Sequence, residues 1–214
     1  MPVVTIARQY GAGGSSVAAL VAERLGADVI DKFLISEVAR RAALTTDDVE
    51  AEDERGRGLI ERFVRSFAPL SSVGGMAWNP PFPDLQLDPR TEVLELTRSI
   101  LHEVAASGNA VIVGRGAGVE LRGVRDLLRV FLWAPEDARI RTIVERLGID
   151  ESTALRLIHE TDANRAAYLH QVYKANWRDP YLYDLVINTG RTGYASAAEA
   201  ILAAARAPIR VVAG

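Results

Sequence analysis

The chain has 214 residues, of which 49% are hydrophobic and 25% charged, with a formal net charge of -3 and no cysteine. This length and composition are those of a globular protein with a sizeable core, the charge gives no long-range attraction for nucleic acid, and the lack of cysteine excludes disulfides and thiolate chemistry. No apolar run approaches about 20 residues and the first residues form no signal-peptide pattern, so we expect a cytoplasmic protein without a membrane or nucleic-acid partner.

The order of the elements that the sequence predicts is that of an α/β domain with a parallel sheet. Residues 3–7 form an apolar strand pattern, a glycine-rich loop follows, and the residues up to Gly26 have the spacing of a helix. A strand, glycine loop, helix and second strand in this order open a parallel sheet. The later elements expected are a strand at 27–31, a helix at 33–43, a charged helical segment at 47–66, an irregular loop at 68–90, a helix near 93–104, strands at 110–114 and 129–134, a helix near 140–147, a polar helical stretch at 151–176, a strand at 183–190 and a helix at 195–206.

The loop between the first strand and the first helix, ARQYGAGGSS at 7–16, has the composition of a phosphate-binding loop. Glycines allow positive φ angles and close approach of a ligand to the backbone, and the N-terminus of a helix favours an anion. Serines there can cap the helix or offer hydroxyls to a phosphate or to Mg²⁺. The residues expected to cradle a phosphate through their amides are Gly11, Ala12, Gly13, Gly14, Ser15 and Ser16.

Two other interpretations of this loop stay open. Gly11 and Gly13 also fit the first two glycines of a dinucleotide-binding turn, and Asp31 lies near the end of the second strand, where that fold binds a ribose. Against this, three residues, Arg8 to Tyr10, separate the strand from the first glycine, and that length suits the wider loop around a β-phosphate. The third interpretation is a glycine-rich turn that only packs.

Two further positions carry groups suited to phosphate. Arg115, in VIVGRG, follows a buried strand and so lies at the carboxyl end of the sheet, where open α/β folds bind ligands. Its guanidinium could hold a phosphate bidentately or form a surface ion pair. Asp162 and Arg165 lie three residues apart, so one helix face carries both and the carboxylate could orient the guanidinium. The polar segment around them is either a solvated helix or a helical hairpin that closes over a phosphoryl group as a lid.

Taken together, these segments resemble the nucleoside monophosphate kinases, most closely the cytidylate kinase-like family. The resemblance extends over nearly the whole chain in the order VTIARQYGAGGSS, DVIDK, VIVGRG, VFLWAPEDARIRTIVERLG, DANRAAY and YDLVINTG. It implies a three-layer P-loop kinase fold, in which a five-stranded parallel sheet is flanked by helices, with an acceptor-binding helical insertion near 33–92 and a helical lid near 150–180. It also implies phosphoryl transfer from ATP, with Mg²⁺, to a small nucleoside monophosphate such as CMP or dCMP.

The loop departs from the family pattern at the lysine. Cytidylate kinases read G-x-x-G-x-G-K-G-T, and alignment of residues 11–13 with G-x-G places Gly14 at the lysine and Arg8 at the leading glycine. The kinase-like subfamily shares the pattern R-x-[FY]-G-x-G-G. We therefore expect Arg8 or Lys32, which flank the loop, to supply the positive charge.

The other roles that the resemblance implies concern the metal, the acceptor and the base. The family's G-R-D motif reads as residues 114–116 here, with the arginine kept and the carboxylate replaced by glycine. Asn188 and Thr189 would lie near the adenine-binding side, and Trp78 or Phe82 in the insertion could stack on a base. The implied roles are contact with Mg²⁺, directly or through water, for Ser15 or Ser16; binding of the acceptor phosphate for Arg115; orientation of the acceptor for Asp31; and stabilisation of the transferring group for Arg165, steadied by Asp162.

Two other functions also fit the sequence. Without the loop lysine, the chain could be a catalytically silent nucleotide- or phosphate-binding module, because anion binding at a helix N-terminus does not require the transition-state charge that the lysine supplies. A dinucleotide-binding turn would instead make it an NAD(P)-dependent oxidoreductase. A zinc site is not expected, since the three histidines lack short ligand spacing and a companion cysteine.

Overall fold

The computed structural model describes residues 2–31, 89–207 and 209, and the chain divides into two compact units, Met1–Ile30 with Val104–Gly214, and Asp31–Glu103. The helices expected at 33–43 and 47–66, most of the loop at 68–90, Lys32, Trp78 and Phe82 lie outside the described residues. The described elements are β1 (Val3–Arg8), α1 (Gly14–Leu25), β2 (Asp28–Ile30), α4 (Pro89–Ser107), β3 (Ala110–Val113), α5 (Ala117–Glu120), β4 (Leu127–Trp133), α6 (Glu136–Leu147), α7 (Glu151–Tyr173), the 3-10 turn η2 (Pro180–Leu182), β5 (Leu185–Asn188) and α8 (Thr189–Arg206).

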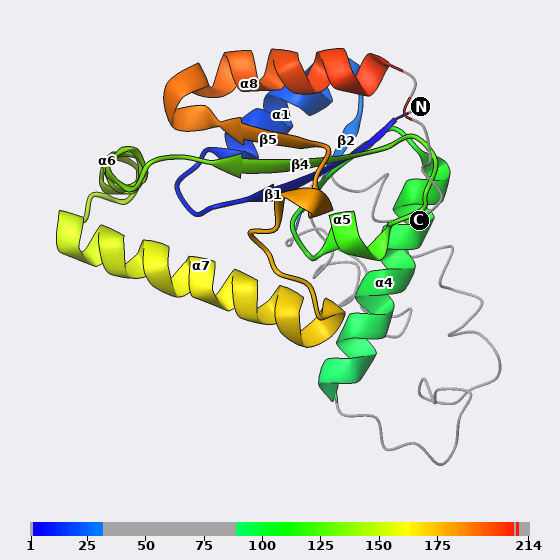
Figure 1. Ribbon diagram of the computed structural model, residues 1–214, viewed down its shortest axis with the longest axis horizontal. Helices are drawn as coiled ribbons and strands as arrows, with labels where there is room; N and C mark the ends of the chain where they lie inside the picture. Colours follow the sequence, from blue (N-terminus) through cyan, green and yellow to red (C-terminus); the bar gives the residue numbers. More distant parts are fainter. Residues whose placement is uncertain (1, 32–88, 208, 210–214) are drawn as a thin grey trace, which may run out of the picture. The chain divides into compact units, whose positions relative to one another are not determined.

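The first unit is built on a five-stranded parallel sheet in the order β2-β3-β1-β4-β5. Helices α1 and α8 cover one face, whereas α5 and α7 lie on the other (Figure 1). Alternate residues of the central strand point to the two faces, so Val4 and Ile6 pack against α1 and α8, while Ala7 packs on the α7 side. This arrangement confirms the three-layer α/β fold with a five-stranded parallel sheet.

The register of the sheet places the carboxyl ends of β1 and β3 side by side. Val3 pairs with Ala110 and Ile6 with Val113, so the residues that follow these strands emerge at the same edge. The glycine loop follows β1 and Arg115 follows β3. The fold therefore brings two of the expected phosphate-binding elements to one end of the sheet.

The polar segment after residue 150 is one continuous helix of 23 residues, α7, which confirms the helical stretch expected at 151–176 and excludes the helical hairpin that was the second interpretation of it. One local prediction was wrong, since the turn expected after β5 is the first turn of α8. Thr189, the first residue of α8, is buried, and its hydroxyl donates to the carbonyls of Trp133 and Ala12 at 3.1 and 3.0 Å. Gly193, whose backbone angles are not helical (φ 74°, ψ 166°), marks a kink within α8.

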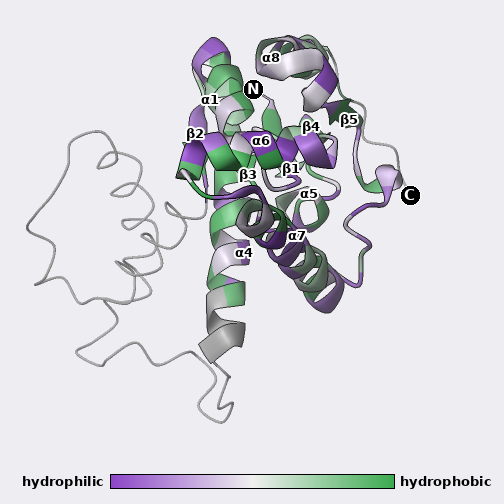
Figure 2. Ribbon diagram, turned by 90° about the vertical axis from the view of Figure 1, so that its left-hand side faces the viewer, coloured by the Kyte–Doolittle hydropathy of each residue, from purple (hydrophilic) through white to green (hydrophobic). Residues whose placement is uncertain are grey.

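Helix α6 shows how charged residues can occupy a buried helix face. Polar and apolar residues alternate around α6 in Figure 2. Its buried residues are Arg139 and Ile143, four positions apart, whereas Arg141 and Arg146 are exposed. A buried arginine requires an ionic or hydrogen-bonding partner.

Among the described helices of the chain, none is long and apolar enough to cross a membrane.

An ion pair joins the segment before β5 to β4, and it predicts sensitivity to acid. The Asp184 carboxylate accepts hydrogen bonds from the backbone N–H of Arg129 (2.8 Å), from Nε (3.1 Å) and from Nη2 (2.7 Å). Burial alone would raise the pKa of Asp184, but these bonds and the guanidinium charge lower it overall. Because the pKa of Asp184 is lower in the folded protein than in the unfolded chain, the charged carboxylate stabilises the fold at pH values above the ordinary pKa near 4. This stabilisation is lost as the pH falls through the pKa of the folded protein.

We therefore expect Asp184→Asn to lower the free energy of unfolding by about 1 kcal/mol at pH 7, a small value because both side chains remain partly exposed. The difference from the wild type should shrink as the pH falls through the folded pKa of Asp184, and urea unfolding across that range measures it. Glu199→Gln removes the partner of Arg24 in a pair with both side chains more than half exposed, and should change little. A constant difference across the titration would contradict the linkage.

Candidate phosphate-binding site

The glycine loop leaves β1 and enters α1 through two residues with left-handed backbone conformations. Gly11 has φ 82° and Gly13, the N-cap of α1, has φ 73°, values that L side chains rarely adopt. No side chain caps α1, which excludes capping as the role of Ser15 or Ser16, and both serines lie exposed in the first turn of the helix. First-turn amides lack partners within a helix, so this end of α1 can receive an anion.

Hydrogen bonds hold the loop against the ends of β4 and β5. The backbone N–H of Gln9 donates to the carbonyl of Leu132 (2.9 Å), and its Oε1 accepts from the N–H of Ala134 (3.2 Å). The carbonyl of Ala12 accepts from the hydroxyl of Thr189 (3.0 Å). The conformation of the loop is therefore fixed from the strand side before any ligand binds.

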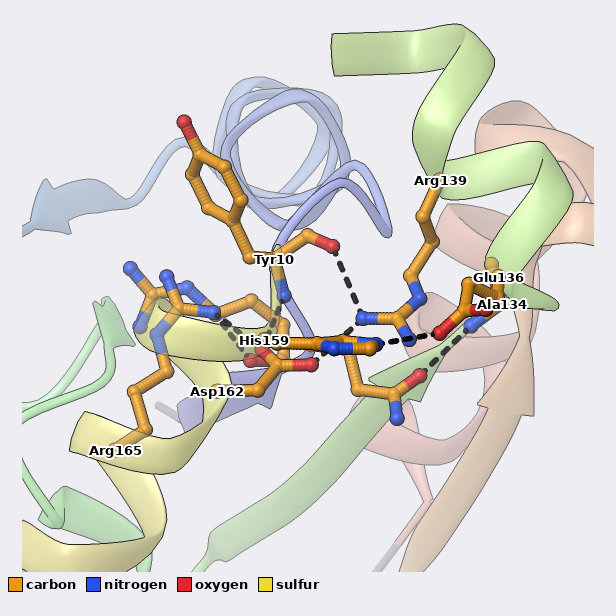
Figure 3. A network of polar contacts seen from close by, with 9 residues as sticks. Tyr10, Ala134, Glu136, Arg139, His159, Asp162 and Arg165 are labelled. Carbon is orange, nitrogen blue, oxygen red and sulfur yellow. Dashed lines mark hydrogen bonds and ion pairs between the residues drawn. The ribbon is translucent and has the colours of Figure 1, made fainter. Parts of the chain in front are cut away.

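A buried ion pair holds the loop from the other side. Asp162 of α7 and Arg139 of α6 are 2.6 Å apart, and their side chains are only 6% and 7% exposed. Asp162 Oδ1 accepts from the backbone N–H of Tyr10 (2.8 Å), and Arg139 Nη1 donates to the Tyr10 carbonyl (3.4 Å) (Figure 3). Helices α6 and α7 therefore both form hydrogen bonds with the backbone of Tyr10.

Arg165 reaches the same loop from α7. Its Nη1 donates to the carbonyl of Arg8 (2.8 Å), and its guanidinium carbon lies 5.7 Å from the centre of the Tyr10 ring. Burial lowers the pKa of Arg165, and the carboxylate of Asp162, 3.7 Å away, opposes that effect. Arg146 lies over the same ring at 5.3 Å and donates to its hydroxyl (2.9 Å).

Asp162 and Arg165 therefore share one helix face, as their spacing predicts, but the main partner of Asp162 is different. Its shortest ion pair is with Arg139, a residue that the sequence analysis did not predict for the site. The signal for Arg139 is its position on the face of α6 that also carries Ile143, where an apolar side chain would be expected. A charge at such a position predicts a buried partner.

Arg115 lies in a tight left-handed turn after β3. Gly114, Arg115 and Gly116 have φ values of 81°, 57° and 70°, and the N–H of Ala117 closes the turn on the Gly114 carbonyl (3.1 Å). A side chain at residue 116 would collide with the ring of Tyr173. The position of the acidic residue in the G-R-D motif is therefore filled from α7, which explains why it is glycine here.

Asp31, Lys32 and the metal-binding residues complete the expected set. Asp31 directly follows β2 and belongs to the second unit, and Lys32 is outside the described residues. The part of the chain that the structure describes contains no group of three or more histidine, aspartate or glutamate side chains placed to hold a metal ion.

A pocket of about 230 Å³ opens beside the loop. It is open on one side and carries no charged side chain among its lining residues. Small side chains, hydroxyls and one aromatic ring suit a flat heterocycle better than a phosphate. The pocket is lined by residues that include Gly11 of the loop, Ala138 and Thr142 of α6, and Thr189, Gly190 and Tyr194 of α8.

Residues 3–191 match the cytidylate kinase-like family. The cytidylate kinase of Methanopyrus kandleri is 27% identical over 197 residues, covering 88% of this chain and 85% of that protein. The cytidylate kinase of Pyrococcus horikoshii is 37% identical over 90 residues, or 42% of this chain and 45% of that one. A crystal structure of an uncharacterized protein from Eubacterium ventriosum has the same fold, with a TM-score of 0.70 at 21% identity over 96% of this chain and 98% of its own. Because the match spans most of its length, the chain belongs to the cytidylate kinase-like family.

Proposed function

We propose that this chain transfers the γ-phosphoryl group of ATP to a nucleoside monophosphate, with CMP and dCMP as the first acceptors to test. The observation that carries the proposal is the loop between β1 and α1, held on both sides so that the first turn of α1 faces the carboxyl end of the sheet with two left-handed glycines. Phosphoryl transfer depends mainly on positioning and on neutralising charge, which such a loop supplies.

The proposed roles follow from these positions. The amides of the loop and of the first turn of α1 hold the β-phosphate of the donor, and Ser15 or Ser16 contacts Mg²⁺. Arg115 holds the acceptor phosphate, and Asp31 orients the acceptor. Arg8 or Lys32 supplies the positive charge that phosphate loops usually take from a lysine. Arg165 stabilises the transferring group, and Asp162 fixes the loop and the helix that carries Arg165.

The pocket beside the loop is the proposed site of the donor base. Ala138→Leu would fill it from α6, so we expect the KM for ATP to rise roughly tenfold or more, since the base would lose its apolar contacts. The kcat at saturating ATP should change little, because the pocket does not contact the reacting group. Initial-rate kinetics with varied ATP measure both constants.

The matched control for this substitution is Glu145→Leu, which adds the same side chain to an exposed position of the same helix. It should leave the KM for ATP unchanged. Equal KM values for Ala138→Leu and the wild type would place the donor base elsewhere.

The direct test of the proposed function is ATP consumption with a panel of nucleoside monophosphates, with CMP and dCMP first. We expect turnover that requires both Mg²⁺ and an acceptor. A folded preparation that turns over no acceptor in the panel would refute the proposal.

A catalytically silent nucleotide-binding module is the second candidate, and one observation favours it. Two charged positions of the family pattern, the loop lysine and the acid of G-R-D, are Gly14 and Gly116 here. Such a module would bind ATP without turnover of any acceptor. Because β1 extends to Arg8, two residues rather than the expected three separate it from the first loop glycine, and it is the family match that argues against the nicotinamide-dependent alternative.

A further inference from the structure

Gly14 is glycine without a conformational need for it. It is buried at the start of α1, and its backbone lacks the positive φ of Gly11 and Gly13. Alanine would therefore fit the helix better, since it costs less conformational entropy. The requirement must come from a neighbouring group.

That neighbour is Arg8, the last residue of β1. A Cβ atom at residue 14 would lie 2.5 Å from Arg8 Cγ and 3.1 Å from its Cβ and Cδ, which are the side-chain carbons nearest the backbone and not the far end of the side chain. Real Cβ atoms essentially never show a contact as short as the one to Cγ, and the two at 3.1 Å are tighter than most real Cβ contacts. The stem of Arg8 therefore crosses directly over the first residue of α1.

The far end of the same side chain reaches the end of β3. A Cβ atom at Gly114 would overlap Nη1 of Arg8, so the guanidinium lies beside the residue that precedes Arg115. The side chain of Arg8 thus runs from β1, over the start of α1, to the neighbouring strand. Its backbone carbonyl is fixed by Arg165 Nη1 at 2.8 Å.

This path places a permanent positive charge between the two expected phosphate sites. The N-terminus of α1 lies on one side of it and the turn that carries Arg115 on the other. A guanidinium keeps its charge throughout the accessible pH range and can bond two phosphate oxygens at once. The stem also fills the space through which a lysine at residue 14 would have to extend.

We infer that Arg8 is the cation of this phosphate loop, and that residue 14 is glycine because the side chain of Arg8 passes over it. The inference rests on the proposed function for its catalytic meaning, and it selects Arg8 over Lys32. The positive charge then comes from the last residue of β1 instead of from the loop. A side chain at residue 14 requires a smaller residue at position 8, so the two positions depend on each other.

The first experiment measures ATP binding with Mg²⁺ by calorimetry on the full chain. Arg8→Met keeps most of the stem and removes the charge, and should weaken binding roughly 10- to 100-fold, the range for loss of charge-assisted hydrogen bonds. The double variant Arg8→Ala with Gly14→Lys should bind ATP at least tenfold more tightly than the double variant Arg8→Ala with Gly14→Ala. Arg24→Ala, in an exposed ion pair on the same helix, should bind as the wild type.

The second experiment needs no ligand. Gly14→Ala should lower Tm in the wild type, because the new Cβ meets the stem of Arg8, and should raise or preserve Tm in the Arg8→Ala background, where only the better helix propensity remains. The same Tm change from Gly14→Ala in both backgrounds would overturn the inference. It would also be overturned if Arg8→Met bound ATP as tightly as the wild type, or if the wild type bound no ATP. ATP binding that depends on Arg8, without turnover of any acceptor, would instead refute only the proposed function.

Discussion

Asp162→Ala should lower the free energy of unfolding by about 3–5 kcal/mol, the range for breaking a buried ion pair. The substitution leaves the guanidinium of Arg139 buried at 7% exposure without its carboxylate, and it removes the acceptor of the Tyr10 N–H. Both losses fall on the glycine loop, so loop order should be lost together with stability. Urea unfolding measures the first, and protection of the Tyr10 amide from hydrogen exchange measures the second.

Three further variants separate the causes of this effect. Asp162→Asn keeps an acceptor for the Tyr10 N–H but not the charge, so its loss should be intermediate. Replacing the pair together, Arg139→Met with Asp162→Leu, should recover part of the loss because no buried charge remains unpaired. Glu160→Ala, which breaks an exposed pair with Arg156 on the same helix, should cost no more than about 0.5 kcal/mol.

A loss of less than about 1 kcal/mol in Asp162→Ala would contradict the buried character of this pair. It would mean that water reaches Arg139 or that the guanidinium finds another acceptor. The main role of Asp162 would then be to orient the guanidinium of Arg165, as the spacing of the two residues predicts.

The sheet and the loop could be predicted from sequence because their signals are local. Val3 to Ile6 is an uninterrupted run of β-branched residues, and the glycines after it mark the turn into α1 at the correct residues. Strand β4 begins two residues before the expected position, because Leu127 and Leu128 extend the pairing with β1. Helix and strand boundaries shift in this way when tertiary pairing adds residues that the local pattern leaves undecided.

The contacts that shape the site could not be predicted, because they join residues far apart in the chain. Tyr194 lies over Gly13 and Tyr173 over Gly116, so both glycines are required by rings from other helices. Sequence spacing carries no information on such distances. The glycines at 14 and 116 are departures from the family pattern in the sequence, whereas in the structure each accommodates a side chain from elsewhere.

This distinction changes the meaning of the missing lysine. A glycine at residue 14 that left an empty space would indicate a loop without its cation. Here the space is occupied by the stem of Arg8, and the guanidinium lies at the end of β3. The glycine at residue 14 therefore fits a loop whose positive charge comes from Arg8 instead of from a lysine. Whether the protein is catalytic then depends on the arginines around the loop.

Arg165→Ala should lower kcat roughly 100-fold or more, within the range attributed to arginines that stabilise a transferring phosphoryl group. The guanidinium holds the Arg8 carbonyl and lies over the Tyr10 ring, so its removal affects both the charge and the position of Arg8. If the interaction forms mainly in the transition state, KM for ATP should change much less than kcat. Steady-state kinetics give both constants, and urea unfolding checks that the variant is folded.

Arg146 offers a matched control for this variant. It lies over the same ring of Tyr10, at 5.3 Å, and donates to the tyrosine hydroxyl, but its side chain is exposed. Arg146→Ala should therefore reduce kcat by no more than a few fold, since it removes a surface stacking contact worth about 0.5–1 kcal/mol. Equal losses in the two variants would show that the stacking on Tyr10, and not the reach of Arg165 to the loop, is what matters. Arg165→Lys keeps the charge without the planar fork, so an activity between those of the wild type and Arg165→Ala would assign part of the effect to hydrogen-bond geometry.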